Sequence, residues 1–189
     1  MFILDNNKIR KTWEGFTAKH GLKITEKETS LFPIADKSKM YLAIEKMNEC
    51  TIFYKYLYYK LDIGIGNYFK VSIPMDTIEK FRIRRHSFFN RLFTGNSINI
   101  KPEKHIELNS SLKELIAGNF KIFSDLEIRT SNYSFHDFGL SQRQIKTLEI
   151  HTKYLPTEVI ELDGIRDLTL NVFYYFRKQN MIKPLTNIE

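Results

Sequence analysis

Residues 51–61 read TIFYKYLYYKL, a stretch dense in the aromatic and branched side chains that favour β-strands. These side chains fall on both alternating faces of the segment, which is typical of a strand covered on both sides by other parts of the fold. We therefore predict a central strand over 51–61, with Lys55 marking its less buried side.

A hairpin is predicted directly after this strand. Residues 62–67, DIGIGN, supply the Asp, Gly and Asn that turns favour. Apolar and polar residues then alternate over 69–73, as they do in a strand with one buried face, and Pro74 is expected to end the run. The two strands of this hairpin would be antiparallel neighbours in a sheet.

Alternation predicts further strands on both sides of the hairpin. Residues 22–25 and 40–45 alternate before it, separated by a polar stretch around Pro33. The clearest pattern after it covers 120–129. The side chains on the apolar face of this segment are Phe120, Ile122, Leu126 and Ile128. Residues 159–162 are predicted as one more short strand.

Apolar residues recur at helical spacing near both ends of the chain. A first helix is predicted over 7–20, with Gly21 as its left-handed stop, and a closing amphipathic helix over 165–178. Helices at the ends with strands between them indicate an α+β fold, in which a mainly antiparallel sheet carries the N-terminal and C-terminal helices. We predict that 1–189 form a single domain of this kind.

The interior holds shorter helical patterns. A brief helix is predicted over 112–117, ending at Gly118, and a helical turn over 141–148. Residues 148–155 fit either a helix or a strand.

Residues 76–95 fit two patterns. Asp76 and Glu79 have the spacing of a capping box, and most of the apolar residues that follow project onto one side of a helix. Residues 81–84, FRIR, alternate instead as a strand does. We adopt the helix and keep the strand as the alternative.

Length and composition fit a folded globular protein. The 189 residues are 42% hydrophobic and 27% charged, far from the composition of disordered chains. Cys50 is the only cysteine, which excludes an internal disulfide and a multi-cysteine metal site and indicates a reducing compartment. The sequence has no signal-peptide core and no apolar run of about eighteen residues, so we expect a cytoplasmic protein without a transmembrane segment.

The net charge of +7 is concentrated in one segment. Residues 80–93, KFRIRRHSFFNRLF, hold five Lys and Arg side chains and no Asp or Glu. Guanidinium groups match phosphate oxygens, and aromatic rings stack on unpaired bases. The candidate nucleic-acid or anion-binding residues are therefore Arg82, Arg84, Arg85, Arg91, Phe88 and Phe89.

Three hypotheses account for this basic segment. It is the charged outer side of a core element, it binds single-stranded nucleic acid, or it lies as an amphipathic helix on an anionic membrane surface. We adopt the first and predict a non-catalytic binding or interaction module of unknown ligand, with an unknown protein as its partner. Nucleic acid and an anionic membrane remain the alternatives.

The sequence shows no catalytic, metal or cofactor motif. The histidines, His20, His86, His105, His136 and His151, lack the short spacings of metal ligands. His136 stands beside Asp137, but no recognisable nucleophile accompanies the pair, and Cys50 is expected to pack as a small hydrophobe. We predict no catalytic residues, no metal and no cofactor.

The motif W-x-x-F-x-A-x-x-H-G-L opens the chain. Its residues are Trp13, Phe16, Ala18, His20, Gly21 and Leu22. It resembles the start of a loose group of uncharacterised bacterial α+β proteins. Over 13–178 the resemblance implies a leading helix, a mainly antiparallel sheet and a closing amphipathic helix. It also implies a short strand over 81–84, and it brings no activity and no catalytic residues.

The aromatic strand bears on assembly as well. Residues 52–59 carry aromatic side chains on both faces, and an exposed aromatic face favours unwanted association. We therefore keep a homodimer, paired or stacked through this strand, as a further hypothesis about the partner.

Overall fold

One antiparallel sheet and three helices make up the described part of the protein. The computed structural model describes residues 6–29, 38–58, 67–86, 98–101, 106–134 and 144–185. All nine strands within these ranges belong to a single sheet. The predicted α+β class is confirmed, with N-terminal and C-terminal helices that contact the sheet.

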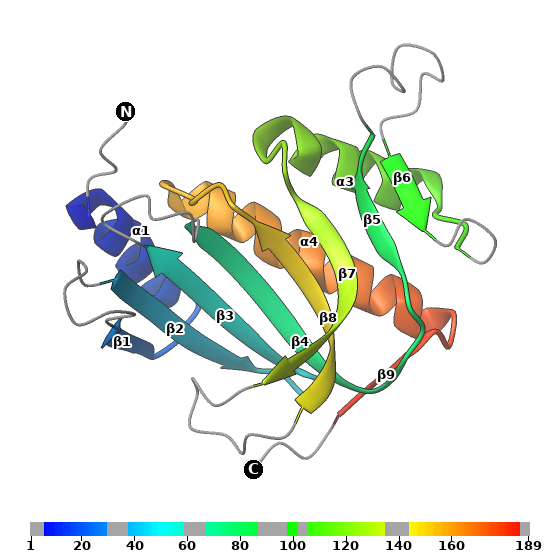
Figure 1. The fold of residues 1–189 in the computed structure, drawn as a ribbon, viewed down its shortest axis with the longest axis horizontal. Coiled ribbons are helices and arrows are strands. Elements are labelled where there is room, and N and C mark those ends of the chain that lie inside the picture. Colours follow the sequence, from blue (N-terminus) through cyan, green and yellow to red (C-terminus); the bar gives the residue numbers. More distant parts are fainter. Residues whose placement is uncertain are drawn as a thin grey trace.

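Strands occupy the middle of the chain, and helices lie toward its ends. The elements follow in the order α1 (Asn6–Lys19), β1 (Ile24–Thr29), β2 (Ser38–Lys46), β3 (Thr51–Tyr58), β4 (Tyr68–Ile78), β5 (Arg82–Arg85), β6 (Ile98–Lys101), α3 (Ser110–Ile122), β7 (Glu127–Ser134), β8 (Gln144–Thr152), α4 (Val159–Lys178) and β9 (Ile182–Pro184). Figure 1 traces this order from the blue α1 to the red β9.

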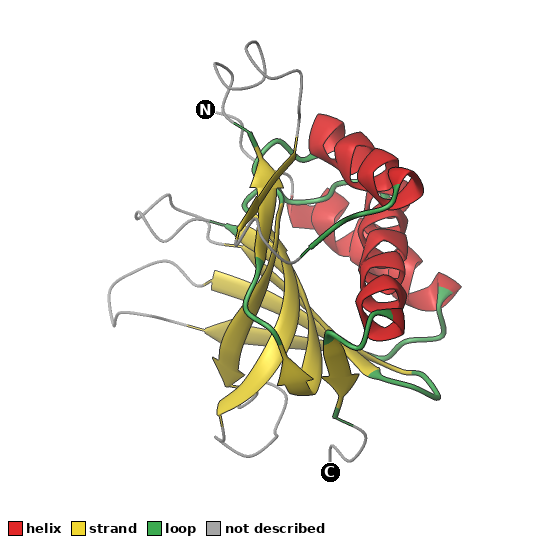
Figure 2. Cartoon of the chain, turned by 90° about the vertical axis from the view of Figure 1, so that its right-hand side faces the viewer, coloured by secondary structure: helices red, strands yellow, loops and turns green. Residues whose placement is uncertain are grey.

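The sheet has the strand order β1-β2-β3-β4-β8-β7-β5-β6, and β9 pairs with β4. The first four strands are therefore sequential neighbours, whereas β8 and β7 separate β4 from β5. Figure 2 shows the helices together on one face of the sheet. No described helix is both long enough and apolar enough to cross a membrane.

The predicted first helix is confirmed, and its motif residues are part of the core. Trp13 and Phe16 are fully buried, and the Trp13 ring lies 5.9 Å from that of Tyr56 and 6.1 Å from that of Phe69. Gly21 has a φ of 65°, the left-handed conformation that ends a helix without a steric penalty. This helix is held to the sheet by aromatic packing.

The predicted central strand is confirmed over 51–58, and 59–61 lie outside the described residues. β3 lies between β2 and β4, and Phe53, Tyr54 and Tyr56 are each at most 2% exposed. Of the aromatic side chains that prompted the homodimer hypothesis, Phe53, Tyr54 and Tyr56 are covered within the chain. These residues supply no argument for a dimer, which stays a prediction.

The register across the sheet decides which side chains face the helices. Aligned from β5 to β3 are Ile83, Ile128, Ile150, Val71 and Tyr54, all fully or nearly fully buried. Successive side chains of a strand point to opposite faces. Arg82 and Arg84, on either side of Ile83, therefore share the face that turns away from the helices.

The helix predicted over 76–95 is wrong for the residues that the structure describes. Asp76 to Ile78 continue β4, and β5 follows at Arg82–Arg85, while 87–95 lie outside the described residues. Phe81 and Ile83 are buried and Arg82 is exposed, so alternation rather than helical spacing matches the observed burial. Pairing of β5 with β6 and β7 explains why the strand form prevails, because cross-strand contacts override local preference. The strand that the resemblance implies over 81–84 agrees with β5.

Pro74 does not end its strand as predicted. β4 runs on to Ile78 and acquires a new neighbour, β9, beyond the end of β3. The Pro74 carbonyl accepts a hydrogen bond from the backbone N–H of Leu185 at 3.2 Å. Proline is tolerated at this position because no ladder hydrogen bond requires its missing N–H.

The boundary between helix and strand near Gly118 is also wrong. α3 continues through Gly118 to Ile122, and β7 begins only at Glu127. Leu112, Ile116 and Phe120 are spaced four apart and buried on one helix face, whereas Ile122 is 55% exposed. The alternation over 120–122 was a coincidence of two side chains, and the burial follows the helical period.

Two further segments differ from the predictions. Residues 159–162, predicted as a strand, form the first turn of α4, where the Glu161 carboxylate accepts the backbone N–H of Thr157 at 2.7 Å and of Glu158 at 3.2 Å. The described part of the helical turn predicted over 141–148 belongs to β8. Both faces of β8 are buried at Leu148 and Glu149, so the apolar spacing gave no clear strand signal.

Candidate anion-binding pocket

The sheet has a gap near the C-terminal end of β4, where β4 and β8 stop pairing. β4 pairs with β8 as far as Met75 opposite Lys146, and β7 pairs with β5 as far as Arg129 opposite Arg82. Residues 76–81 connect the two paired regions and pass the ends of both inner strands. The β7–β8 pair and this connection thus leave a gap between them.

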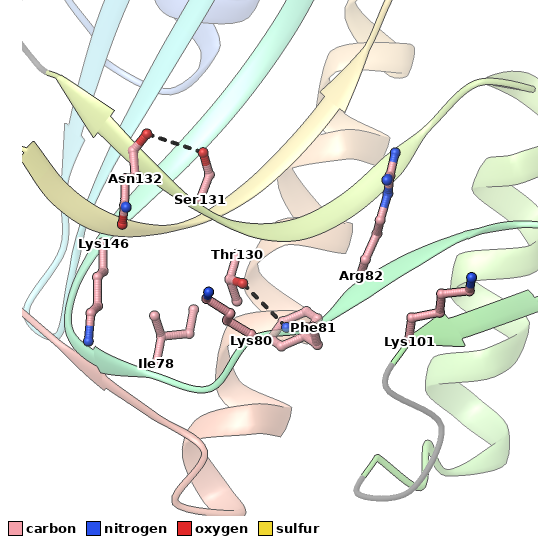
Figure 3. A pocket seen from close by; sticks show the side chains of 9 residues that line it. All are labelled: Ile78, Lys80, Phe81, Arg82, Lys101, Thr130, Ser131, Asn132 and Lys146. Carbon is pink, nitrogen blue, oxygen red and sulfur yellow. Dashed lines mark hydrogen bonds between the residues drawn. The ribbon is translucent and has the colours of Figure 1, made fainter.

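A pocket of about 490 Å³ occupies the gap. Its lining residues come from the end of β4, the connection, β5, β6, β7 and β8. They are Ile78, Lys80, Phe81, Arg82, Lys101, Thr130, Ser131, Asn132 and Lys146, drawn in Figure 3. Five strands and one connection therefore contribute to a single site.

Four cationic side chains stand around this pocket. Lys146 extends from β8 at one end, Lys80 of the connection lies near the middle beside Phe81 and Thr130, and Arg82 and Lys101 stand at the other end on β5 and β6 (Figure 3). Arg82 and Lys101 are direct cross-strand partners. All four residues are exposed to solvent, so an ion arriving from outside can reach them.

The charges at the pocket are not balanced from within. None of the described lining residues is Asp or Glu. Arg82 forms an ion pair with Glu127, which is not among the lining residues. For Lys80, Lys101 and Lys146 no ion pair is found within the described part of the chain. The pocket therefore has at least three positive charges available for an anion.

Backbone and hydroxyl groups of β7 add polar contacts. Thr130 donates its backbone N–H to the Phe81 carbonyl at 3.1 Å, and its Oγ1 accepts the Phe81 N–H at 3.3 Å. N–H groups of alternate strand residues point to the same side. The N–H of Asn132 therefore points toward the side where β5 no longer pairs with β7, which is the side of the pocket.

Phe81 and Ile78 form the apolar part of the wall. Phe81 is 3% exposed, and its ring centroid lies 4.5 Å from that of Phe176 on α4. Ile78 is half-buried and packs against the main hydrophobic core. This part of the pocket is rigid because it is continuous with the core.

An alternating row of charges holds Arg82 in place. Glu127 also meets Arg129 at 3.5 Å, Arg129 Nε donates to Glu149 at 3.2 Å, and Lys70 Nζ lies 3.5 Å from the other Glu149 oxygen. Glu149 is 1% exposed, and burial lowers the pKa of Lys70 to about 8. These side chains form ion pairs with one another, whereas no described ion pair involves the pocket lysines.

The structure divides the predicted basic residues. Arg82 lines the pocket together with Lys80, and Arg84 shares its exposed face on β5. Arg85 is half-buried and points to the opposite face. The predicted residues Phe88, Phe89 and Arg91 lie outside the described residues.

Sequence reasoning missed Lys101, Lys146 and the β7 residues Thr130 to Asn132. Each lysine is a single charge in a strand, far along the chain from 80–93. Only the pairing of β5 with β6 and β7, and of β7 with β8, brings them to Lys80. No local signal in the sequence marks them.

The described residues offer no metal centre. No group of three or more His, Cys, Asp or Glu side chains within the described ranges is arranged to hold an ion. Cys50 is buried as predicted, and burial raises the pKa of its thiol to about 11, so it stays protonated at neutral pH. His136 and Asp137 lie outside the described residues.

A second charged region, made of residues that do not line the pocket, joins α4 to β2 and β3. Arg166 Nε donates to Glu45 at 3.0 Å, and the Tyr54 hydroxyl donates to the same carboxylate at 2.6 Å. Burial alone would raise the pKa of Glu45, but these hydrogen bonds outweigh it and the pKa falls below its ordinary value. We call Glu45, Tyr54 and Arg166, together with the neighbouring contacts of Asp163, the buried charge network.

Asp163 connects this network to α1. Its carboxylate oxygens lie 2.7 Å from His20 Nε2 and 2.6 Å from Lys19 Nζ. Burial opposes ionisation, yet the hydrogen bonds from His20 and Lys19 prevail and hold the pKa of Asp163 below its usual value. His20 of the opening motif thus fastens α1 to α4, which is a structural role.

Neither a protein-family model nor a curated protein nor a solved structure matches the chain. The resemblance to uncharacterised bacterial α+β proteins therefore stays a prediction, and the pocket must be interpreted from its own residues.

Proposed function

We propose that the protein is a non-catalytic binding module that holds an anionic ligand in the pocket between the β7–β8 pair and the connection from β4 to β5. The observation that carries this proposal is the approach of Lys80, Arg82, Lys101 and Lys146 to one pocket without an acidic residue in its described lining.

Physical considerations of size and charge support it. Small-molecule sites commonly measure about 300–1,000 Å³ and combine an apolar wall with a few placed polar groups, which describes this pocket of about 490 Å³. An anion bound in a pocket lined by cations is attracted to them, and it weakens the repulsion between those that it approaches.

Titration with inorganic pyrophosphate tests the proposal. We expect isothermal titration calorimetry to detect binding at low salt, and the Lys80→Gln/Lys146→Gln variant to bind at least about tenfold more weakly, a loss of about 1.4 kcal/mol. The matched control is Lys8→Gln/Lys11→Gln, which removes the same charge from the exposed side of α1. Equal weakening in both variants, or no binding by the unmodified protein, would refute a specific site.

Nucleic acid is the second candidate, favoured by the shared exposed face of Arg82 and Arg84 on β5. A strand lying along β5 would gain affinity through counterion release, with a salt dependence of about −0.7 in log K per phosphate neutralised on a single strand. We expect Arg84→Gln to flatten this salt dependence for a ten-nucleotide single-stranded RNA. If the slope stays unchanged while Lys80→Gln/Lys146→Gln alters it, the strand does not follow β5.

A further inference from the structure

We infer that the partner of this site is an acidic peptide segment, which adds as an extended strand to the edge of β7 beside the pocket. This inference rests on the proposed function and specifies the anionic ligand as part of a protein partner. Strand addition combines main-chain hydrogen bonds along a sheet edge with contacts of the side chains on either face.

β7 extends beyond its neighbour on one side. β5 pairs with β7 as far as Arg82 opposite Arg129, and one more hydrogen bond joins the Thr130 N–H to the Phe81 carbonyl. On its other side β7 stays paired with β8 as far as Ser134. Among the strands that the structure describes, none pairs with β7 beyond Thr130 on the β5 side.

The backbone groups of this extension point into the gap. Because N–H and C=O groups of alternate residues point to the same side of a strand, those of Asn132 and Ser134 face the side that Thr130 faces. The pocket lies on this side. The Asn132 carbonyl accepts the Ser131 hydroxyl at 3.3 Å, which leaves it a second lone pair. We call the backbone groups of Asn132 and Ser134 the open edge of β7.

The charges beside the open edge favour an acidic segment. Lys146 is the cross-strand partner of Asn132, and Lys80 of the connection lines the same pocket. All three residues are exposed, so a segment is able to approach them from solution. Carboxylates on an added strand would meet these cations and no acid among the described lining residues.

The outer edge of β1 differs in its charges. β1 stands first in the order of the sheet, so one of its edges has no partner among the described strands. It carries Glu26, Lys27 and Glu28, and Glu26 forms an ion pair with Lys39 at 3.2 Å. Charged side chains on an edge strand oppose the pairing of further strands. An acidic segment is therefore expected at the open edge of β7 and not at β1.

Amide hydrogen exchange followed by NMR tests the inference on the unmodified protein. The probe is an acetylated and amidated octapeptide of alternating Glu and Val. At saturation we expect exchange of the Asn132 and Ser134 N–H groups to slow at least tenfold, because the added strand accepts them. The N–H groups of Ser131 and Tyr133 point to β8 and serve as internal controls, with changes below about twofold. Peptide binding without this pattern would overturn strand addition.

A matched peptide separates strand addition from attraction between charges alone. N-methylation of the four central residues keeps the charge of the octapeptide and removes backbone donors from both of its edges. With both peptides labelled for fluorescence anisotropy, we expect the methylated one to bind at least tenfold more weakly, a difference of about 1.4 kcal/mol. Equal affinities of the two peptides would overturn the inference.

Two variants at one position locate the added strand. Asn132→Pro removes the N–H of the open edge, and proline is tolerated on a strand edge where no ladder hydrogen bond needs that group. Asn132→Ala keeps the N–H and removes only the side chain. We expect at least a tenfold loss of peptide affinity in Asn132→Pro and less than about a threefold loss in Asn132→Ala. Equal losses in the two folded variants would contradict the role of the backbone, and the exchange and peptide measurements require neither variant.

The outcomes separate the inference from the proposed function. Binding of pyrophosphate without binding of the octapeptide would overturn the acidic segment and leave anion binding intact. Absence of binding by both would remove the proposed function as well. A ten-nucleotide single-stranded RNA that binds more than tenfold more tightly than the octapeptide would overturn the peptide partner and favour the nucleic-acid candidate.

Discussion

The buried charge network and the pocket use similar residues in opposite ways. In the network, Arg166 meets Glu45, and His20 and Lys19 meet Asp163, so each carboxylate has a cationic partner on another element. In the pocket, lysines of the connection, β6 and β8 line one cavity, and among the described lining residues Arg82 alone forms an ion pair with an acid. The charges of the network are therefore paired within the protein, whereas the lysines of the pocket are able to pair with an anion from solution.

This difference separates stability from recognition. A partly buried ion pair whose members are hydrogen-bonded holds elements together, and loss of one member leaves a buried charge without compensation. Exposed lysines that lack a partner contribute little to folding, because water solvates them well. Substitutions in the two regions should therefore affect different measurements.

The largest effect is expected from Arg166→Met. It leaves Glu45, which is 8% exposed, without its guanidinium partner, so the free energy of unfolding should fall by about 3 kcal/mol. Urea unfolding measures the change. The Glu45→Gln/Arg166→Met double variant should recover at least half of the loss, and pyrophosphate binding should be unchanged in any variant that stays folded. A decrease in the free energy of unfolding below about 1 kcal/mol would show that the ion pair between Arg166 and Glu45 contributes little to stability.

The second-largest effect on stability is expected from Asp163→Asn, and it depends on pH. Its pKa is lower in the folded protein than in the unfolded chain, so its stabilising contribution is complete above about pH 4 and disappears as the pH falls through the folded pKa. Asp163→Asn should therefore cost about 1 kcal/mol at pH 7 and much less near pH 3. Urea unfolding of both proteins at the two pH values provides the comparison, and a difference independent of pH would contradict it.

Glu127→Gln should strengthen anion binding in the pocket, because it releases Arg82 from its ion pair. The substitution removes the negative charge that pairs with Arg82, so the affinity for pyrophosphate should rise about threefold, through stronger attraction at a partly exposed site. Stability should fall by less than about 1 kcal/mol. Calorimetric titration and urea unfolding measure the two effects. Weaker binding would show instead that Glu127 is needed to position Arg82.

The smallest effect is expected for the folding of Lys80→Gln/Lys146→Gln. Both side chains are exposed and without a described ion pair, so the free energy of unfolding should stay within about 0.5 kcal/mol of the unmodified value. The same variant should lose about tenfold in pyrophosphate affinity. A destabilisation comparable to that of Arg166→Met would mean that these lysines have a structural role.

Sequence patterns predicted elements where one period dominates. In α1, Ile9, Trp13 and Phe16 recur at helical spacing and all three are buried, and in β3 the aromatic residues alternate as the strand requires. The patterns failed where two periods coincide. Over 76–95 most apolar residues project onto one side of a helix, whereas Phe81 and Ile83 alternate as in a strand, and pairing of β5 with β7 decides for the strand.

The candidate site was predicted in part. Arg82 and the basic character of its segment were recognised from a local excess of charge, because such an excess is visible along the chain. Lys101 and Lys146 were not recognised, because each is an ordinary lysine of an alternating strand. Their role depends on register, and a shift of one residue would turn each of them to the other face.

Local order along the chain determined the fold class, the end helices, the central strand and the excess of positive charge, since each depends on residues a few positions apart. Tertiary structure decided which strands are neighbours, that pairing between β4 and β8 ends at Met75, and which cations line the pocket there. The physical reason is that pairing between distant strands is selected by the burial of whole faces, a global balance that no short window of sequence contains.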